Sequence, residues 1–271
     1  MNNKELYTRL KNILSEISEE DYPEIYNIIE NGLDFSDEAV YEEAYNIAGE
    51  LHEADGTKIL PECVADFMID VYTDELNSGN VNAACDIGSL YYTGRAGEQN
   101  YKKAVEYYTI AADGGCRQAQ ENLGYCFYYG RDIPVDYEKA FHYFALGAFD
   151  GHLRSLYKIG DMYRNGYYVD KNEVEAFRIY MHCAQGLNED NIHLVGADIM
   201  MRLGDCFFKG IGTEVDNKQA LKHYQLAEQM YYERLESGDF LIKNCYKHVL
   251  KNQEEARQRL NDVLPGYEWT K

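Results

Sequence analysis

The chain contains an internal repeat built around pairs of glycines. In each of four segments a glycine is followed six positions later by a second glycine, then ten positions on by an alanine and four further by an aromatic residue. The first glycines of the four segments are Gly88, Gly124, Gly160 and Gly204, spaced 36, 36 and 44 residues apart. A period of this length is typical of arrays in which each repeat is one small supersecondary unit.

Each repeat is expected to be a pair of antiparallel helices, helix A and helix B. The apolar residues around Gly88 fall on one face at 3.6 residues per turn. Because a glycine inside a helix costs about 1 kcal/mol relative to alanine, we expect helix B to approach helix A closely at that point. The second glycine is expected to end helix A in the left-handed conformation. Candidate N-caps for helix B are Asn100, Asp136, Asn172 and Asp216.

These residues resemble the SEL-one-like repeat family, a subclass of the tetratricopeptide superfamily. The family pattern of A-x3-LG-x2-Y-x2-G, a loop and KA-x2-Y-x2-AA-x2-G can be followed from Ala83 to Gly115. The resemblance covers residues 81–228, in four repeats. It implies an all-α fold, a right-handed α-solenoid of stacked antiparallel helix pairs with helical caps, because a single pair cannot bury its own apolar face.

Weaker patterns flank the four repeats. We expect acidic N-terminal helices and a degenerate repeat over residues 1–80, the four repeats over 81–228, and a C-terminal capping helix and tail over 229–271, all in one continuous solenoid. The expected flanking helices cover residues 4–16, 21–31, 61–76, 218–235 and 238–263. Ser18 or Asp21 is expected to cap the second of these, and Pro265 to end the last.

The third repeat is longer than the first two by eight residues, which fall at 188–195. This segment is expected to extend the preceding turn or to prolong the next helix A. A site that grips a partner and a neutral surface loop are both open interpretations of it.

Charge excludes several classes of function. The chain has 47 Asp and Glu against 26 Lys and Arg, a net charge of −21, which argues against binding to nucleic acid or to an anionic membrane. Residues 1–80 alone carry a net −16. A basic partner is therefore expected to touch this N-terminal part. With no apolar run long enough to span a membrane, no signal peptide and seven cysteines, we expect a cytoplasmic protein with reduced thiols.

No motif for catalysis or for a cofactor is present. The sequence has no CxxC, HExxH or G-x-S-x-G pattern, and Gly210-Ile211-Gly212 lacks the strand and the lysine-serine ending of a phosphate loop. We therefore expect neither a cofactor nor a metal, and no enzymatic activity. One secreted, cysteine-rich branch of the family, linked to β-lactam binding, staples each repeat with a disulfide. That cysteine pattern is absent here.

In the superfamily that the chain resembles, helix A lines a concave groove, and positions −6, −3, +1, +4 and +5 around its glycine face the ligand. Helical geometry also places these positions opposite the buried arc. They include Cys85 and Gln118. The candidate partner-binding residues are Ser89, Tyr92, Glu121, Tyr125, Tyr128, Tyr129, Tyr157, Asp161, Arg164, Asp205 and Phe208. The aromatic residues among them predict an exposed stripe suited to binding; packing of the rings on neighbouring repeats is the alternative.

The leading hypothesis is a non-catalytic scaffold or adaptor that binds a segment of another protein, plausibly a basic segment, in the tyrosine-lined groove. One alternative is an acidic stoichiometric inhibitor, of the immunity type, that neutralises a basic toxin or nuclease through long-range attraction. Such binding would weaken at high salt. An enzyme of unknown class is a third and weaker alternative.

Overall fold

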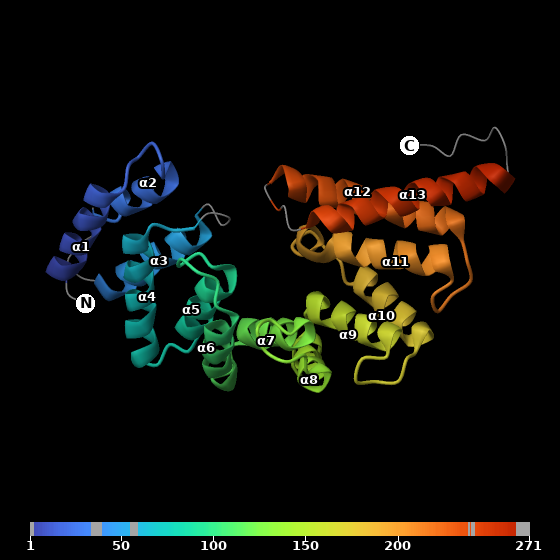
Figure 1. Ribbon diagram of the computed structural model, residues 1–271, viewed down its shortest axis with the longest axis horizontal. Helices are drawn as coiled ribbons and strands as arrows, with labels where there is room; N and C mark the ends of the chain where they lie inside the picture. Colours follow the sequence, from blue (N-terminus) through green and yellow to red (C-terminus); the bar gives the residue numbers. More distant parts are fainter. Residues whose placement is uncertain (1–2, 34–39, 55–58, 238, 240–241, 264–271) are drawn as a thin grey trace. The chain divides into compact units, whose positions relative to one another are not determined.

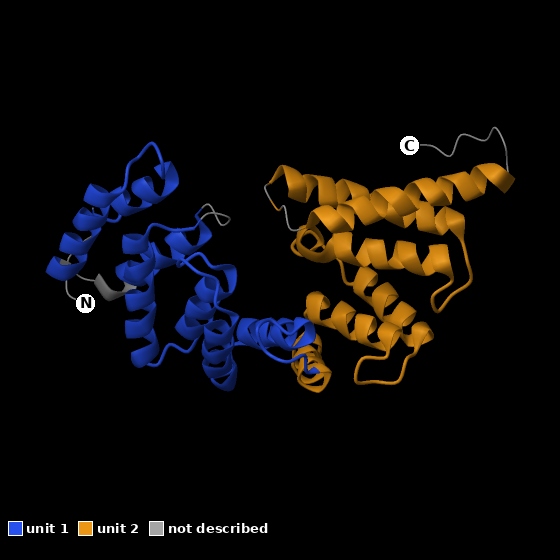
Figure 2. Ribbon diagram, viewed as in Figure 1, with its two compact units in different colours: residues 1–136 blue, residues 137–271 orange. Residues whose placement is uncertain are grey.

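The computed structural model describes residues 3–33, 40–54, 59–237, 239 and 242–263. Within these residues the chain forms thirteen α-helices and one short π-helix (Figure 1). They group into two compact units, unit 1 over residues 1–136 and unit 2 over residues 137–271 (Figure 2). The boundary falls inside the second repeat, between its helix A and its helix B.

Unit 1 consists of sequential helices that pack on their neighbours in the chain. Its elements are α1 (Asn3–Glu16), α2 (Pro23–Asn31), α3 (Val40–Glu53), α4 (Glu62–Asn77), α5 (Asn82–Thr93), α6 (Tyr101–Asp113) and α7 (Arg117–Tyr129). One apolar core runs from α1 to α5 and includes Leu10, Leu51, Phe67 and Ile87. The degenerate repeat expected before residue 80 is the helix pair α3 and α4.

Unit 2 follows the same order. Its elements are α8 (Tyr137–Phe149), α9 (Leu153–Asn165), α10 (Glu173–Gln185), the π-helix η1 (Ile192–Gly196), α11 (Ala197–Lys209), α12 (Asn217–Glu236) and α13 (Lys243–Val263). Its core joins Tyr180, Leu203, Tyr224 and Val249. The all-helical fold of sequentially paired helices that the repeat predicts is confirmed.

The glycine inside helix A has the packing reason that the sequence predicts. A Cβ atom added to Gly88 would lie 2.6 Å from the ring of Tyr108, the helix B aromatic of the same repeat. Gly204 faces Tyr224 in the same way, also at 2.6 Å. A tyrosine ring on the glycine therefore sets how closely helices A and B approach.

The turns of the repeat also agree with the sequence. Gly94, Gly130, Gly166 and Gly210 end their helices in the left-handed conformation, with φ between 64° and 75°. The side chains of Asn100, Asn172 and Asp216 accept hydrogen bonds from backbone N–H groups in the first turn of helix B. These contacts satisfy donors that a helix start leaves unpaired.

The flanking segments bring two corrections. Helix α2 begins at Pro23, and no side chain caps it, because Ser18 and Asp21 bond to each other instead. The C-terminal helix α13 begins at Lys243 rather than near residue 238, and Pro265 lies outside the described residues.

The eight extra residues of the third repeat both extend the turn and prolong the following helix, as expected. Asn188 and Asn191 close the turn by accepting each other's backbone N–H. The π-helix η1 then runs directly into α11.

Candidate binding site on the groove face

A pocket of about 490 Å³ lies on the face of the A helices within unit 1. We call it the Asp86 pocket. Five helices contribute to its lining: α3, α4 through Tyr72, α5, α6 through Tyr108, and the first half of α7. Four predicted groove positions line it, namely Cys85, Ser89, Tyr92 and Gln118.

A half-buried carboxylate is the charged centre of this pocket. The hydroxyl of Tyr45 donates to an oxygen of Asp86 at 3.2 Å. Burial raises the pKa of Asp86 to about 6, and the hydrogen bond from Tyr45 opposes that shift only in part. Burial and the charge of Asp86 in turn raise the pKa of Tyr45 to about 12. The hydrogen bond from Tyr45 therefore does not offset the free-energy cost of burying the negative charge of Asp86.

The second polar group of the pocket is His52, near the end of α3. Its Nε2 lies 3.2 Å from the hydroxyl of Ser89, and its Nδ1 lies 3.4 Å from the hydroxyl of Tyr72, which donates to the carbonyl of Ala48. Burial and the nearby charge of Arg95 lower the pKa of His52, so the ring is neutral at pH 7. It links α3 to α4 and α5.

The pair Ser89 and His52 has the spacing of a nucleophile and its base, but its surroundings are those of a structural contact. Ser89 lies in the middle of α5, where backbone N–H groups are used by the helix itself. They offer no donors to a developing oxyanion beside the hydroxyl.

No lysine or arginine lines the Asp86 pocket among the described residues. Arg95, whose charge lowers the pKa of His52, is buried and donates to the carbonyls of Leu51, His52 and Ala54 at the end of α3. The Arg95 guanidinium therefore interacts with the C-terminal end of α3, which carries a partial negative charge. Asp86 and Glu53 leave the pocket negative.

Beyond the pocket, α7 carries three of the predicted tyrosines. Tyr129 is 47% exposed, and its ring packs on Tyr128 and Tyr125 at centroid distances of 4.9 and 6.2 Å. Tyr125 and Tyr128 are half-buried, whereas Glu121 on the same helix is buried. In unit 1 the predicted stripe thus exists as a tyrosine cluster with one well-exposed ring.

In unit 2 the groove positions are used internally. The guanidinium of Arg202 donates to both oxygens of Asp161 at 2.7 Å and lies 4.3 Å from the ring centroid of Tyr157. The hydroxyl of Tyr180 donates to the same carboxylate at 2.8 Å. Although burial alone would raise it, the pKa of Asp161 is lowered because the charge and hydrogen bonds of Arg202 outweigh burial.

The C-terminal helix α13 covers the last repeat. His248 and Asn252 contact an oxygen of Asp205 at 2.8 and 3.2 Å, and the guanidinium of Arg259 lies 3.9 Å from the ring centroid of Phe208. Arg164 reaches Asp205 at 3.5 Å. Burial would raise the pKa of Asp205, but the hydrogen bonds from His248 and Tyr224 and the charges of His248 and Lys209 lower it to about 2.

The expected exposure of the stripe is therefore wrong for unit 2. Tyr157, Asp161, Asp205 and Phe208 are each less than 9% exposed, and only Arg164 is half-buried. The physical reason is that arginines within the unit stack on both rings and pair with both carboxylates. Binding by these residues stays a prediction without support from their accessibility.

Sequence reasoning missed Tyr45, His52, Tyr72 and Asp86. Asp86 stands two residues before the glycine, outside the groove register, and the other three belong to the degenerate repeat. For the carboxylates of unit 2, the sequence does contain a pattern that could have predicted their burial. Where the position after the glycine is Asp161 or Asp205, the helix B aromatic is a tyrosine that donates to it.

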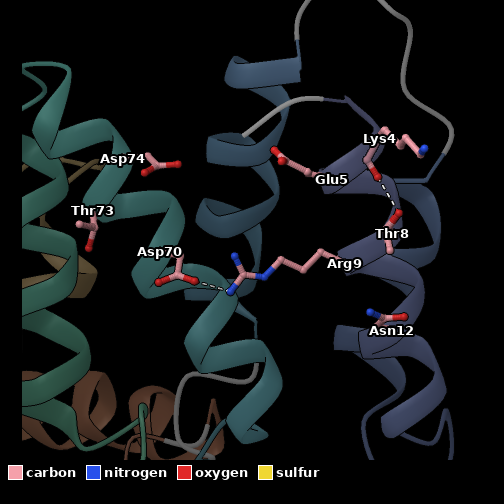
Figure 3. Close-up of a pocket in the computed structure, with 8 residues that line it drawn as sticks. All are labelled: Lys4, Glu5, Thr8, Arg9, Asn12, Asp70, Thr73 and Asp74. Carbon is pink, nitrogen blue, oxygen red and sulfur yellow. Dashed lines mark hydrogen bonds and ion pairs between the residues drawn. The ribbon is translucent and has the colours of Figure 1, made fainter.

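A second cavity of unit 1 lies between α1 and α4 and measures about 730 Å³. In Figure 3, Arg9 extends from α1 to the carboxylate of Asp70 on α4, and the dashed line marks their ion pair. Thr8 donates within its own helix to the carbonyl of Lys4. The lining of this cavity carries both signs of charge, Lys4 and Arg9 against Glu5, Asp70 and Asp74, and Arg9 is already paired. The Asp86 pocket differs, because no described lysine or arginine lines it.

Three further observations concern chemistry. All seven cysteines are free thiols. Among the described residues no group of three or more His, Cys, Asp or Glu side chains is placed to hold a metal ion. In the same part of the chain, no helix combines the length and the apolar character needed to cross a membrane.

Comparison with known proteins agrees with the repeat. The sequence model of the Sel1 repeat matches residues 81–116, 117–152, 153–180 and 197–232, which is half of the chain. No curated protein matches the chain in sequence.

Solved structures similar to this chain include two repeat proteins of the same fold. The first is a protective antigen of uropathogenic Escherichia coli strains that displays an SLR fold, with 18% identity and a TM-score of 0.57 over 83% of this chain. This chain spans about half of that protein, 47% of its length. The second is a Sel1 repeat protein from Oxalobacter formigenes, with 19% identity, a TM-score of 0.55, and coverage of 81% of this chain and 88% of that one.

Proposed function

Because this chain belongs to the Sel1 repeat family, whose members are generally protein-interaction scaffolds and typically non-catalytic, we propose that it is an adaptor that binds a segment of another protein on the groove face of unit 1. The observation that carries the proposal is the Asp86 pocket, which lies beside the tyrosine cluster of α7 on that face. Tyrosines supply large, rigid contact area with a polar tip, which suits recognition of a peptide.

Charge supports a basic segment as the ligand. The pocket contains Asp86 and Glu53, and no described lysine or arginine lines it. The chain as a whole has a net charge of −21. A basic segment would be attracted over a distance and then bound at these carboxylates. The seven free thiols are compatible with action in the cytoplasm, which we include in the proposal.

The proposal is tested by affinity capture from the source organism with matched variants of the full chain. The groove variant combines Tyr125→Ala with Tyr129→Ala. The control is Tyr232→Ala, which removes a tyrosine that is 52% exposed on α12 of unit 2. Thermal unfolding of each variant is measured to establish that the fold is intact.

With the groove variant we expect the amount of captured partner to fall by about tenfold or more, which corresponds to a loss of about 1.4 kcal/mol in binding free energy. With Tyr232→Ala the amount should be unchanged. Equal capture by the wild type and the groove variant would refute binding on this face.

A further inference from the structure

The Asp86 pocket of unit 1 has the same chemical parts that hold an arginine inside unit 2. In unit 2 these parts are a carboxylate, a tyrosine hydroxyl that donates to it, and a tyrosine ring that faces the guanidinium. Asp161, Tyr180 and Tyr157 supply them to Arg202. This set leaves little of the guanidinium unsatisfied, because a planar fork of donors matches a carboxylate while its face stacks on an aromatic ring.

Unit 1 supplies the carboxylate and the hydroxyl without the arginine. Asp86 accepts from Tyr45, as Asp161 accepts from Tyr180. The position of Arg202, two residues before the helix A glycine, is taken in the first repeat by Asp86 itself. No lysine or arginine among the described residues lines the pocket. The described lining of the Asp86 pocket therefore contains no residue that corresponds to Arg202 of unit 2.

Aromatic rings surround the carboxylate. Tyr45 and Tyr72 pack edge to face at a centroid distance of 5.7 Å, and His52 packs on Tyr72 at 6.1 Å. Tyr92 and Tyr108 line the same pocket. A ring attracts a cation that lies over its face within about 6 Å of its centroid, and arginine is the cation most often found there.

We propose that the Asp86 pocket binds the guanidinium of an arginine side chain carried by the partner segment. Asp86 pairs with the guanidinium, and the tyrosines face its plane. Glu53 adds a second negative charge at the rim. At about 490 Å³ the pocket has room for the side chain and for part of the neighbouring peptide. This inference rests on the proposed function, since it names the side chain that the groove recognises.

Open space at Gly49 allows a substitution that fills the pocket. Gly49 lines the pocket, and a Cβ atom added there would have no neighbour within 4 Å. Gly49→Leu therefore extends a side chain into the pocket without a clash at its Cβ. It also replaces a glycine in the middle of α3 by a strong helix former.

The test is an NMR titration of the full, nitrogen-15-labelled chain with three small probes. They are N-acetyl-argininamide, N-acetyl-lysinamide and N-acetyl-citrullinamide, the last having the shape of the arginine probe without its charge. We expect saturable shifts of the backbone amides of Gly49, His52 and Ser89 with the arginine probe. Affinity for the other two should be weaker by about tenfold or more, or about 1.4 kcal/mol.

Two variants and a control assign the site. Asp86→Asn and Gly49→Leu are each expected to weaken the arginine probe by about tenfold or more. Glu50→Gln removes one negative charge from an exposed position of α3 that does not line the pocket, and it should leave the affinity unchanged. Unshifted amides elsewhere in the spectrum establish that each variant is folded.

Each of the following results overturns the inference: no saturable shift at these amides, equal binding of the citrulline probe, equal or tighter binding of the lysine probe, or full affinity in Asp86→Asn. An equal loss with Glu50→Gln would also overturn it, because general acidity would then explain the binding. If the probes fail while the α7 variant still loses its partner, the adaptor function stands and only the arginine pocket is wrong.

Discussion

Replacing Asp86 by asparagine should stabilise unit 1 at neutral pH. The fold raises the pKa of Asp86 from 3.8 to about 6, chiefly through burial. Such a shift corresponds to about 3 kcal/mol between the two protonation states. Because Asp86 is only half-buried, solvent screens part of this cost, and we expect a gain of about 1–3 kcal/mol in the free energy of unfolding at pH 7.5. Asparagine keeps an oxygen that Tyr45 can still donate to.

The sign of the pH dependence follows from the direction of the shift. A carboxyl whose pKa is raised on folding binds its proton more tightly in the folded chain than in the unfolded chain. Its favourable contribution is complete below about pH 4 and is lost as the pH rises through about 6. The gain from Asp86→Asn should therefore shrink to about half a kcal/mol or less at pH 4.

Amide hydrogen exchange of α5 peptides, read by mass spectrometry at pH 7.5 and pH 4, measures this difference for unit 1 alone. The two units need not unfold together, so a single transition for the whole chain would mix them. The single tryptophan, Trp269, lies outside the described residues. Lower protection in Asp86→Asn at pH 7.5, or the same gain at both pH values, would refute the reasoning.

The other predictions concern the repeat itself. Gly204→Ala should destabilise unit 2 by about 1–3 kcal/mol, because the added Cβ would lie 2.6 Å from the ring of Tyr224. Gly49→Ala should stabilise unit 1 by about 1 kcal/mol, because nothing lies within 4 Å of the added atom and alanine favours the helix. Amide hydrogen exchange of peptides from each unit measures the two changes separately, and equal effects would contradict the packing described. Arg202→Met should lower the free energy of unfolding by about 3–5 kcal/mol, because it leaves the buried carboxylate of Asp161 without its guanidinium. Adding Asp161→Asn should recover part of that stability. Strictly additive effects in a double-mutant cycle would argue against an interaction between the two residues.

The fold could be predicted from the sequence because its determinants are local. The spacing from Gly88 to Tyr108 places a small residue and a large ring at one crossing of two helices, and the structure has this contact. Likewise Gly94 ends its helix where the chain needs a left-handed residue. Such features depend on positions within one repeat, so the periodicity alone reveals them.

The candidate site could be predicted only in part, because it depends on contacts between repeats. Ser89 and Tyr92 were found by their register and do line the pocket. The register could not reveal that Arg202 reaches back to Asp161 in the preceding repeat, because that contact depends on side-chain length and direction. Asp86 was missed for the same reason, since its partner Tyr45 belongs to a repeat too degenerate to align.

The most direct test of the account is the titration of the Asp86 carboxyl itself, followed by its carbon-13 resonance with and without saturating N-acetyl-argininamide. Without the probe, the account predicts a pKa of about 6. With the probe bound, the pKa should fall below the ordinary carboxyl value of about 3.9, because a bound guanidinium favours the ionised form. A titration curve that does not move when the probe is added would contradict the claim that this pocket binds an arginine.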